Sequence, residues 1–192
     1  TAGYISEQAR AEFFSAFDAA NVDLKAFSED FYEKRCLARL APVLETLRFI
    51  RHETNTWLEL TTLLIPGEND SPHEIDKMTQ WIVENLGKDV PLHFTAFHPD
   101  LRMQDIGQTP PETLSRARDI AMKNGMQFVY TGNVHDRRGG STYCPSCGKL
   151  LIERDWFEIG AYTMRGSECG GCGQRIPGHF DAKPGVWGSR RM

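Results

Sequence analysis

Apolar residues follow two alternating patterns in the first two-thirds of the chain: short apolar runs, and stripes spaced three or four residues apart. Short runs predict strands, and the wider spacing predicts amphipathic helices. We expect strands over residues 21–27, 56–65, 92–98 and 126–131. Strands that alternate with helices imply right-handed crossovers, and therefore an α/β fold with a parallel sheet or a partial barrel.

Polar capping residues mark where the helices begin. Ser6 and Ser28 precede two helices, and prolines follow Ser71 and Thr109 at the start of two others. The expected inward stripes are Ala9, Phe13 and Phe17; Val43, Leu47 and Ile50; Ile75, Met78, Ile82 and Leu86; and Leu114, Ala117 and Ala121.

The pattern changes near Asn133, where a Gly- and Arg-rich stretch begins and the helical spacing ends. We therefore predict a strand–helix domain over residues 1–135. Residues 136–192 are predicted to hold a linker, a small cysteine-rich unit with short strands, and an extended tail.

Four of the five cysteines form two matching pairs, and each pair is followed by glycine: Cys144 and Cys147, and Cys169 and Cys172. Such a turn points both sulfurs at one ion, and the two turns predict a closed, structural four-thiolate site of the zinc-ribbon type. Zinc is the expected ion. Iron, alone or in an iron–sulfur cluster, takes the same ligands. Two disulfides are the alternative without metal, and Cys36 is expected to be a small buried residue.

Composition narrows the function classes. The net charge of −4 gives no reason to expect nucleic acid or an anionic membrane as partner. No apolar run reaches the roughly 18 residues of a membrane span, and no signal peptide is visible. Paired cysteines fit metal binding in a reducing cytoplasm. The start at Thr1 resembles the end of a strand, so we expect an N-terminally incomplete protein.

Charged residues interrupt the first predicted strand. Val22, Leu24 and Ala26 would face the covering helices, because alternate residues share a face. Asp23 and Lys25 would then point together to the other face, as a structural ion pair or as a polar ligand site. Both interpretations stay open.

The next two strands can extend that polar face. Glu59 and Thr61 share one face of the second strand, and His98 ends the third strand. Parallel α/β folds gather function at that end of their strands.

These residues together resemble a known family. The matching motifs are Thr1-Ala2-Gly3, Asp23-Leu24-Lys25, Leu64-Ile65-Pro66-Gly67-Glu68-Asn69-Asp70, Phe97-His98, Gly132-Asn133-Val134-His135-Asp136 and Tyr143-Cys144-Pro145-Ser146-Cys147-Gly148. In order and spacing they resemble the second half of radical S-adenosylmethionine (SAM) enzymes. The subgroup resembles pyruvate formate-lyase activating enzymes, and the radical SAM component of the AmmeMemoRadiSam system is the closer match.

The resemblance implies a fold class: the C-terminal portion of a partial (β/α) barrel of the radical SAM type, followed by a small zinc-ribbon segment. It implies that Thr1 and Asp23 lie near the SAM carboxylate, that Lys25 pairs with it, and that His98 lies near the adenosyl group. It also implies an enzyme that uses a 4Fe-4S cluster to cleave SAM to a 5′-deoxyadenosyl radical. That radical abstracts hydrogen from an unidentified substrate, for which a protein is one candidate.

Two departures from the family matter. The three-cysteine motif for the catalytic cluster is absent, so we expect no catalytic residue in this chain and no activity from it alone. Thr61 stands where the family carries an arginine, which places one SAM contact in doubt.

Other interpretations compete at single residues. His135 and Asp136 form either a turn, with Asp136 paired to Arg137 or Arg138, or a lid over a substrate pocket. Trp156 and Trp187 are expected to pack between ribbon and barrel.

Two other functions compete with the leading hypothesis. The chain can be a non-catalytic zinc-ribbon binding module on a half-barrel scaffold. It can also be a different barrel enzyme with a metal on His93, His98 and His135, although their spacing fits no tight ligand motif.

Overall fold

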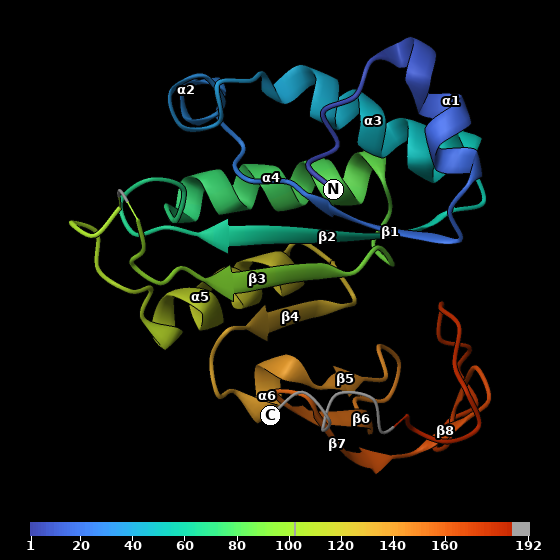
Figure 1. The fold of residues 1–192 in the computed structure, drawn as a ribbon. Coiled ribbons are helices and arrows are strands. Elements are labelled where there is room, and N and C mark those ends of the chain that lie inside the picture. Colours follow the sequence, from blue (N-terminus) through green and yellow to red (C-terminus); the bar gives the residue numbers. More distant parts are fainter. Residues whose placement is uncertain (102, 186–192) are drawn as a thin grey trace.

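The computed structural model describes residues 1–101 and 103–185. Its main feature is a four-stranded parallel sheet in the order β1-β2-β3-β4, so each strand lies beside its neighbour in sequence. Figure 1 shows this succession, with the C-terminal segment next to β4. The elements are α1 (Glu7–Ser15), β1 (Ala19–Asp23), α2 (Glu29–Phe31), the π-helix η1 (Tyr32–Cys36), α3 (Leu40–Glu53), β2 (Trp57–Leu64), α4 (Pro72–Asn85), β3 (Leu92–Ala96), α5 (Pro111–Lys123) and β4 (Val129–Gly132).

Three of the four expected helical stripes are confirmed. Every residue expected on the inward faces of α3, α4 and α5 is buried, and Leu86 follows α4 with 1% of its surface exposed. The Ser71 hydroxyl accepts a hydrogen bond from the Glu74 amide, as expected of a helix N-cap. Ser28 caps α2 in the same way.

The stripe predicted for α1 is wrong. Arg10 and Phe14 are the buried residues of this helix. Phe13 and Phe17 are 42% and 47% exposed, and their ring centroids lie 5.0 Å apart. The cause is a polar contact between helices. The Arg10 guanidinium donates to Thr46 Oγ1 at 3.1 Å and pairs with Glu45 at 3.1 Å, both on α3.

The two faces of the sheet differ. In β2, Leu58, Leu60, Thr62 and Leu64 are buried, while the alternate residues are part-exposed or exposed. The same alternation places Val22, Leu24 and Ala26 in the core, as expected. Parallel sheets are normally covered on both faces. Here the second face is polar and partly open, and we call it the open face.

The C-terminal segment adds a helical turn and five short strands: α6 (Arg137–Gly140), β5 (Thr142–Tyr143), β6 (Leu150–Asp155), β7 (Glu158–Tyr162), β8 (Met164–Arg165) and β9 (Glu168–Cys169). Strands β5-β6-β7 form one antiparallel sheet, and β8-β9 form a second. A small buried cluster holds them together and includes Phe128, just before β4. This segment therefore packs against the edge of the parallel sheet.

Within the part of the chain that is described, no helix has both the length and the apolar character needed to cross a bilayer. Trp187 lies outside the described residues.

Candidate functional site

The two cysteine pairs come together at one point. The four sulfurs of Cys144, Cys147, Cys169 and Cys172 all lie within 4.8 Å of one another, and we call this group the four-cysteine cluster. The Cys144–Cys172 and Cys147–Cys169 sulfur separations are 3.6 and 3.7 Å. In a tetrahedron with metal–sulfur bonds of about 2.3 Å, the sulfurs are about 3.8 Å apart. The donor set thus fits one tetrahedral ion.

The two turns have the same backbone hydrogen bonds. The amides of Cys144 and Cys169 each donate to a carbonyl five residues later, at 2.9 Å in both turns. The amides of Gly148 and Gly173 donate back to the first cysteine of each pair, at 2.9 and 3.0 Å. Both glycines have positive φ, 71° and 75°, which a side chain would strain. Local backbone geometry thus aims the sulfurs inward.

Backbone dipoles already favour a thiolate at this site. Amides of Cys172 and Gly171 point at the Cys169 sulfur and lower the pKa of that thiol to about 6. The pKa of Cys147 is raised to about 11, because the Lys149 amide that favours its thiolate is outweighed by the neighbouring sulfurs and by desolvation. Metal ligation requires all four sulfurs to be deprotonated, and neighbouring thiolates repel one another. A divalent cation between them offsets this repulsion. Cys36 lies apart, half-buried at the end of η1.

The residues expected to bind SAM fall into two groups. Lys25 Nζ pairs with Asp23 Oδ2 at 2.8 Å, and both side chains are about 40% exposed on the open face. The Thr1 carbonyl accepts from the Asp23 amide at 2.9 Å, so Thr1 lies beside the end of β1. Thr61 is on the adjacent strand, where its hydroxyl donates to Asn21 Oδ1 at 2.8 Å.

His98 forms the second group alone. It lies two residues beyond the end of β3, is exposed, and its Nδ1 contacts the carbonyl of Pro99 at 3.0 Å. The structure gives no contact between His98 and the Asp23–Lys25 pair.

A buried asparagine that sequence reasoning missed holds the ends of β1 and β2 together. The Asn69 amide nitrogen donates to the carbonyls of Lys25 at 2.6 Å and Leu63 at 2.8 Å. Its oxygen accepts from the Ile65 amide at 2.7 Å. Asn69 is 2% exposed, and it fixes the backbone of Lys25. The signal in the sequence is an asparagine in the loop after Pro66-Gly67, where such side chains bond to nearby backbone.

A cavity of about 590 Å³ lies between the open face and the C-terminal segment, and we call it the ribbon cavity. Its floor includes Glu59, His93 and Tyr130 from three adjacent strands, and Arg154 from β6. Its wall includes Trp156 and Phe157, at the turn between β6 and β7, and residues 131–134.

The residues of the linker have other partners than expected. Asp136 pairs with neither arginine of the linker. It caps α6 by accepting from the Gly139 amide at 2.9 Å, and it accepts from Thr131 Oγ1 at 2.9 Å. Arg137 pairs instead with Asp155 at 3.0 Å.

Trp156, in the wall of the cavity, also differs from expectation. Trp156 is 51% exposed beside the His135 ring at 5.1 Å, which contradicts the packing role predicted for it.

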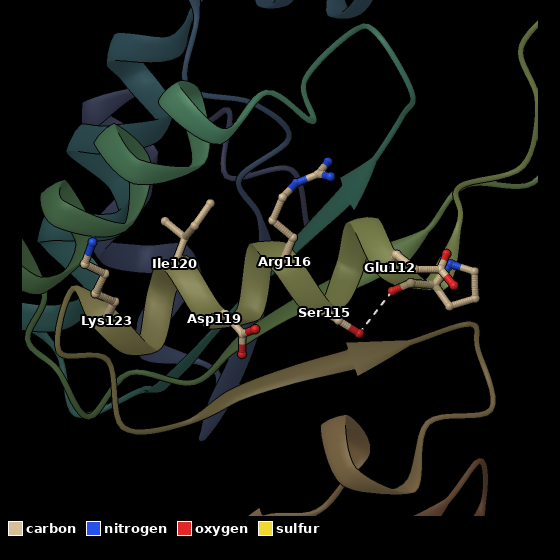
Figure 2. A pocket seen from close by; sticks show the side chains of 7 residues that line it. Glu112, Ser115, Arg116, Asp119, Ile120 and Lys123 are labelled. Carbon is tan, nitrogen blue, oxygen red and sulfur yellow. Dashed lines mark hydrogen bonds between the residues drawn. The ribbon is translucent and has the colours of Figure 1, made fainter.

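A second hollow, of about 500 Å³, carries no comparable chemistry. Figure 2 shows that all the side chains that line it come from α5, among them Arg116 and Asp119. The Ser115 hydroxyl donates to the Pro111 carbonyl within the same helix at 3.2 Å. Because every residue that lines it belongs to this one helix, the hollow is a surface groove rather than a site.

Over 67% of its length, this chain resembles a solved domain of a pyruvate-formate lyase-activating enzyme from Bacteroides vulgatus, with a TM-score of 0.58 and 15% identity, and the match covers 75% of that chain. The expected fold class is confirmed. A radical SAM methyltransferase from Sphaerobacter thermophilus also matches, at a TM-score of 0.47 and 18% identity over 69% of this chain and 37% of that one.

One curated relative is close in sequence. The uncharacterized protein MJ0808 of Methanocaldococcus jannaschii is 40% identical over 178 residues, which are 92% of this chain. The chain spans about half the length of that relative, 52%. No protein-family model matches the chain.

Proposed function

We propose that this chain is part of a radical SAM enzyme of the pyruvate formate-lyase activating type, of the kind found in the AmmeMemoRadiSam system. The observation that carries the proposal is the open face. A radical SAM-like α/β fold leaves a polar face on its parallel strands, and a lysine–aspartate pair lies at the end of β1. Parallel α/β folds bind ligands at this end of their strands.

In this proposal, SAM binds at that end of the open face. Lys25 exchanges its partner from Asp23 to the SAM carboxylate, which costs little because the pair is about 40% exposed. Thr1, Asp23 and Thr61 surround the amino-acid end of SAM, and His98 lies toward the adenosyl end. When bound, SAM and a 4Fe-4S cluster supply a 5′-deoxyadenosyl radical for hydrogen abstraction. The residues of this chain orient SAM.

The four-cysteine cluster holds one zinc ion in a structural role. The ribbon it closes is small, and apart from ligand cysteines its buried cluster contains only Leu151, Ile152, Met164 and Ile176 from the described part of the ribbon, so the metal supplies much of its stability. Elemental analysis of the purified chain should give one zinc per chain and no iron. Stoichiometric iron would overturn the assignment of zinc.

Two measurements test the function. After anaerobic reconstitution with iron and sulfide, and with SAM and a one-electron reductant such as dithionite added, the longer protein should release 5′-deoxyadenosine, and residues 1–192 alone should not. Lys25→Ala in the longer protein should weaken SAM binding about tenfold, as expected for loss of one charge-assisted hydrogen bond. Lys34→Ala is the matched control, because Lys34 is paired with Asp30 on the surface and is 70% exposed.

Two results would contradict the proposal. One is a longer protein that binds SAM but yields no nucleoside. The other is an affinity of Lys25→Ala equal to that of Lys34→Ala, which would make the Asp23–Lys25 pair purely structural.

A further inference from the structure

The ribbon cavity has a floor of four side chains from four neighbouring strands. Glu59 on β2 contacts His93 on β3, with 2.8 Å between Oε2 and Nε2. The His93 ring stacks on Tyr130 of β4 at 5.0 Å, and the Arg154 guanidinium lies 5.7 Å from the centre of the Tyr130 ring. A carboxylate, an imidazole, a phenol and a guanidinium thus form one continuous row.

Glu59 orients His93 and leaves one imidazole nitrogen for another partner. The other oxygen of Glu59 accepts from Trp57 Nε1 at 3.0 Å. Hydrogen bonding from His93 lowers the pKa of Glu59, so this group is a carboxylate at neutral pH. A carboxylate can only accept, so His93 Nε2 carries a proton, and Nδ1 is the ring nitrogen left for another partner. The floor therefore offers one imidazole nitrogen to a polar group of a ligand.

Arg154 supplies the opposite kind of group. Its guanidinium donates to Thr142 Oγ1 at 2.7 Å. Among residues 1–101 and 103–185, no carboxylate forms an ion pair with it. A guanidinium has five N–H donors in a planar fork that matches carboxylate or phosphate. The charge of Arg154 also helps to lower the pKa of Glu59, so that carboxylate offsets part of it, while the N–H groups not used by Thr142 stay available to an anion.

The aromatic wall stands on an unfavourable turn. Trp156 and Phe157 occupy the two turn positions between β6 and β7, where Gly, Asn and Asp are usual. Trp156 has φ +56°, which a bulky residue adopts at a cost. The two side chains are 51% and 62% exposed. Neither ring is buried in the core, so core packing does not explain this strained arrangement.

We propose that the ribbon cavity binds a planar aromatic molecule that carries an anionic group. The aromatic ring lies against Trp156 and Phe157, a polar N–H or O–H group on it hydrogen-bonds with His93 Nδ1, and the anion pairs with Arg154. The cavity volume of about 590 Å³ suits a small molecule of this class. This inference rests on the proposed function, because in that function such a ligand is the substrate of the enzyme or part of the substrate.

Binding of a ligand to the ribbon cavity can be measured without SAM or the 4Fe-4S cluster. Failure of this inference and failure of the proposed function are therefore distinguishable. Indole-3-acetate is the probe, because it combines a ring, an N–H donor and a carboxylate. Indole-3-acetamide lacks the charge, and acetate lacks the ring. Saturation-transfer NMR and titration calorimetry of the zinc-loaded chain should detect binding when indole-3-acetate is present at about 10 mM. Such a high concentration is needed because so small a molecule is expected to bind weakly. The amide should bind about tenfold more weakly, and acetate should not be detected.

Two variants locate the binding. Trp156→Gly relieves the positive φ, so its melting temperature should be equal to or higher than that of the wild type, yet probe binding should be lost. A lost signal with retained stability cannot come from misfolding. Arg154→Gln should weaken indole-3-acetate about tenfold and leave indole-3-acetamide unchanged. Arg165→Gln, on the exposed side of β8, is the matched control.

Three results would overturn the inference. The first is no binding of indole-3-acetate at the stated concentration. The second is equal binding of acid and amide, which would remove the role of Arg154. The third is unchanged binding by Trp156→Gly, which would place the ring elsewhere. Indoxyl phosphate tests whether the anionic group of the ligand can be a phosphate instead of a carboxylate. If it can, indoxyl phosphate should compete with indole-3-acetate for the same cavity.

Discussion

Replacement of Asn69 by alanine tests whether one buried side chain holds the ends of two strands in place. The alanine removes three hydrogen bonds, of 2.6, 2.7 and 2.8 Å, to the backbone of Lys25, Ile65 and Leu63. Each bond contributes about 1 kcal/mol net, and leaving the Ile65 amide without a partner costs about 1 kcal/mol more. We expect the free energy of unfolding to fall by about 3–4 kcal/mol. That is a large part of the 5–15 kcal/mol typical of a domain.

Urea denaturation of the zinc-loaded chain measures this difference. Asn55→Ala is the control, because Asn55 is exposed in the loop before β2 and should change stability by less than about 0.5 kcal/mol. Hydrogen exchange at the Ile65 amide gives a local reading and should speed up in the Asn69 variant. If the two variants unfold at the same urea concentration, the argument that Asn69 joins β1 to β2 is refuted.

Three further predictions concern the metal, a carboxylate and a glycine. Chelation of the metal should expose the amides of residues 144–172 to exchange while β1–β4 stay protected, and retained protection of the ribbon would argue against a structural ion. The pKa of Glu59 is lower in the folded chain than in the unfolded chain. The stabilisation that its carboxylate gives is therefore complete above the pKa of the unfolded chain, and it is lost as the pH falls through the pKa of the folded chain. Glu59→Gln should therefore destabilise the chain at pH 7 and converge with the wild type in acid denaturation curves; a difference that persists in acid would refute the pairing. Gly3→Ala should lower the melting temperature more than Gly67→Ala, because both have positive φ but only a Cβ at Gly3 meets Val22, at 2.8 Å; equal losses would refute the clash.

Much of the fold could be predicted from the sequence, because its signals are local. The stripes of α3, α4 and α5 and the strand cores follow from residue spacing within one element. The four-cysteine cluster follows from two short motifs whose turns aim their own sulfurs. In α1, Phe13, Phe14 and Phe17 offer two possible faces, and spacing alone chose the wrong one. The choice is made by Arg10, which finds its partners on α3.

The ribbon cavity could not be predicted, because it depends on contacts between distant segments. Tyr130 and Arg154 meet only when the β6–β7 hairpin packs beside β4, and nothing local in either segment signals this. Thr109 shows the same limit. The sequence marks it only as the residue before the helix start, but it is 1% exposed, donates to the Leu64 carbonyl at 2.5 Å and accepts from the Phe97 amide at 2.9 Å. Its partners lie on other segments, which residue spacing cannot reveal.

The placing of the sulfurs has a consequence for oxidative stress. The two cysteine pairs bracket the hairpin that carries Trp156 and Phe157, so one ion held by the four sulfurs would anchor both ends of the cavity wall. Cys147 and Cys172 are exposed, and exposed thiolates are where peroxide attacks first. A peroxide that ejects the ion would loosen the wall without touching any residue of the floor, and reduction followed by fresh metal would restore it. Peroxide damage at the four-cysteine cluster would then disturb the ribbon cavity before it disturbs the parallel sheet.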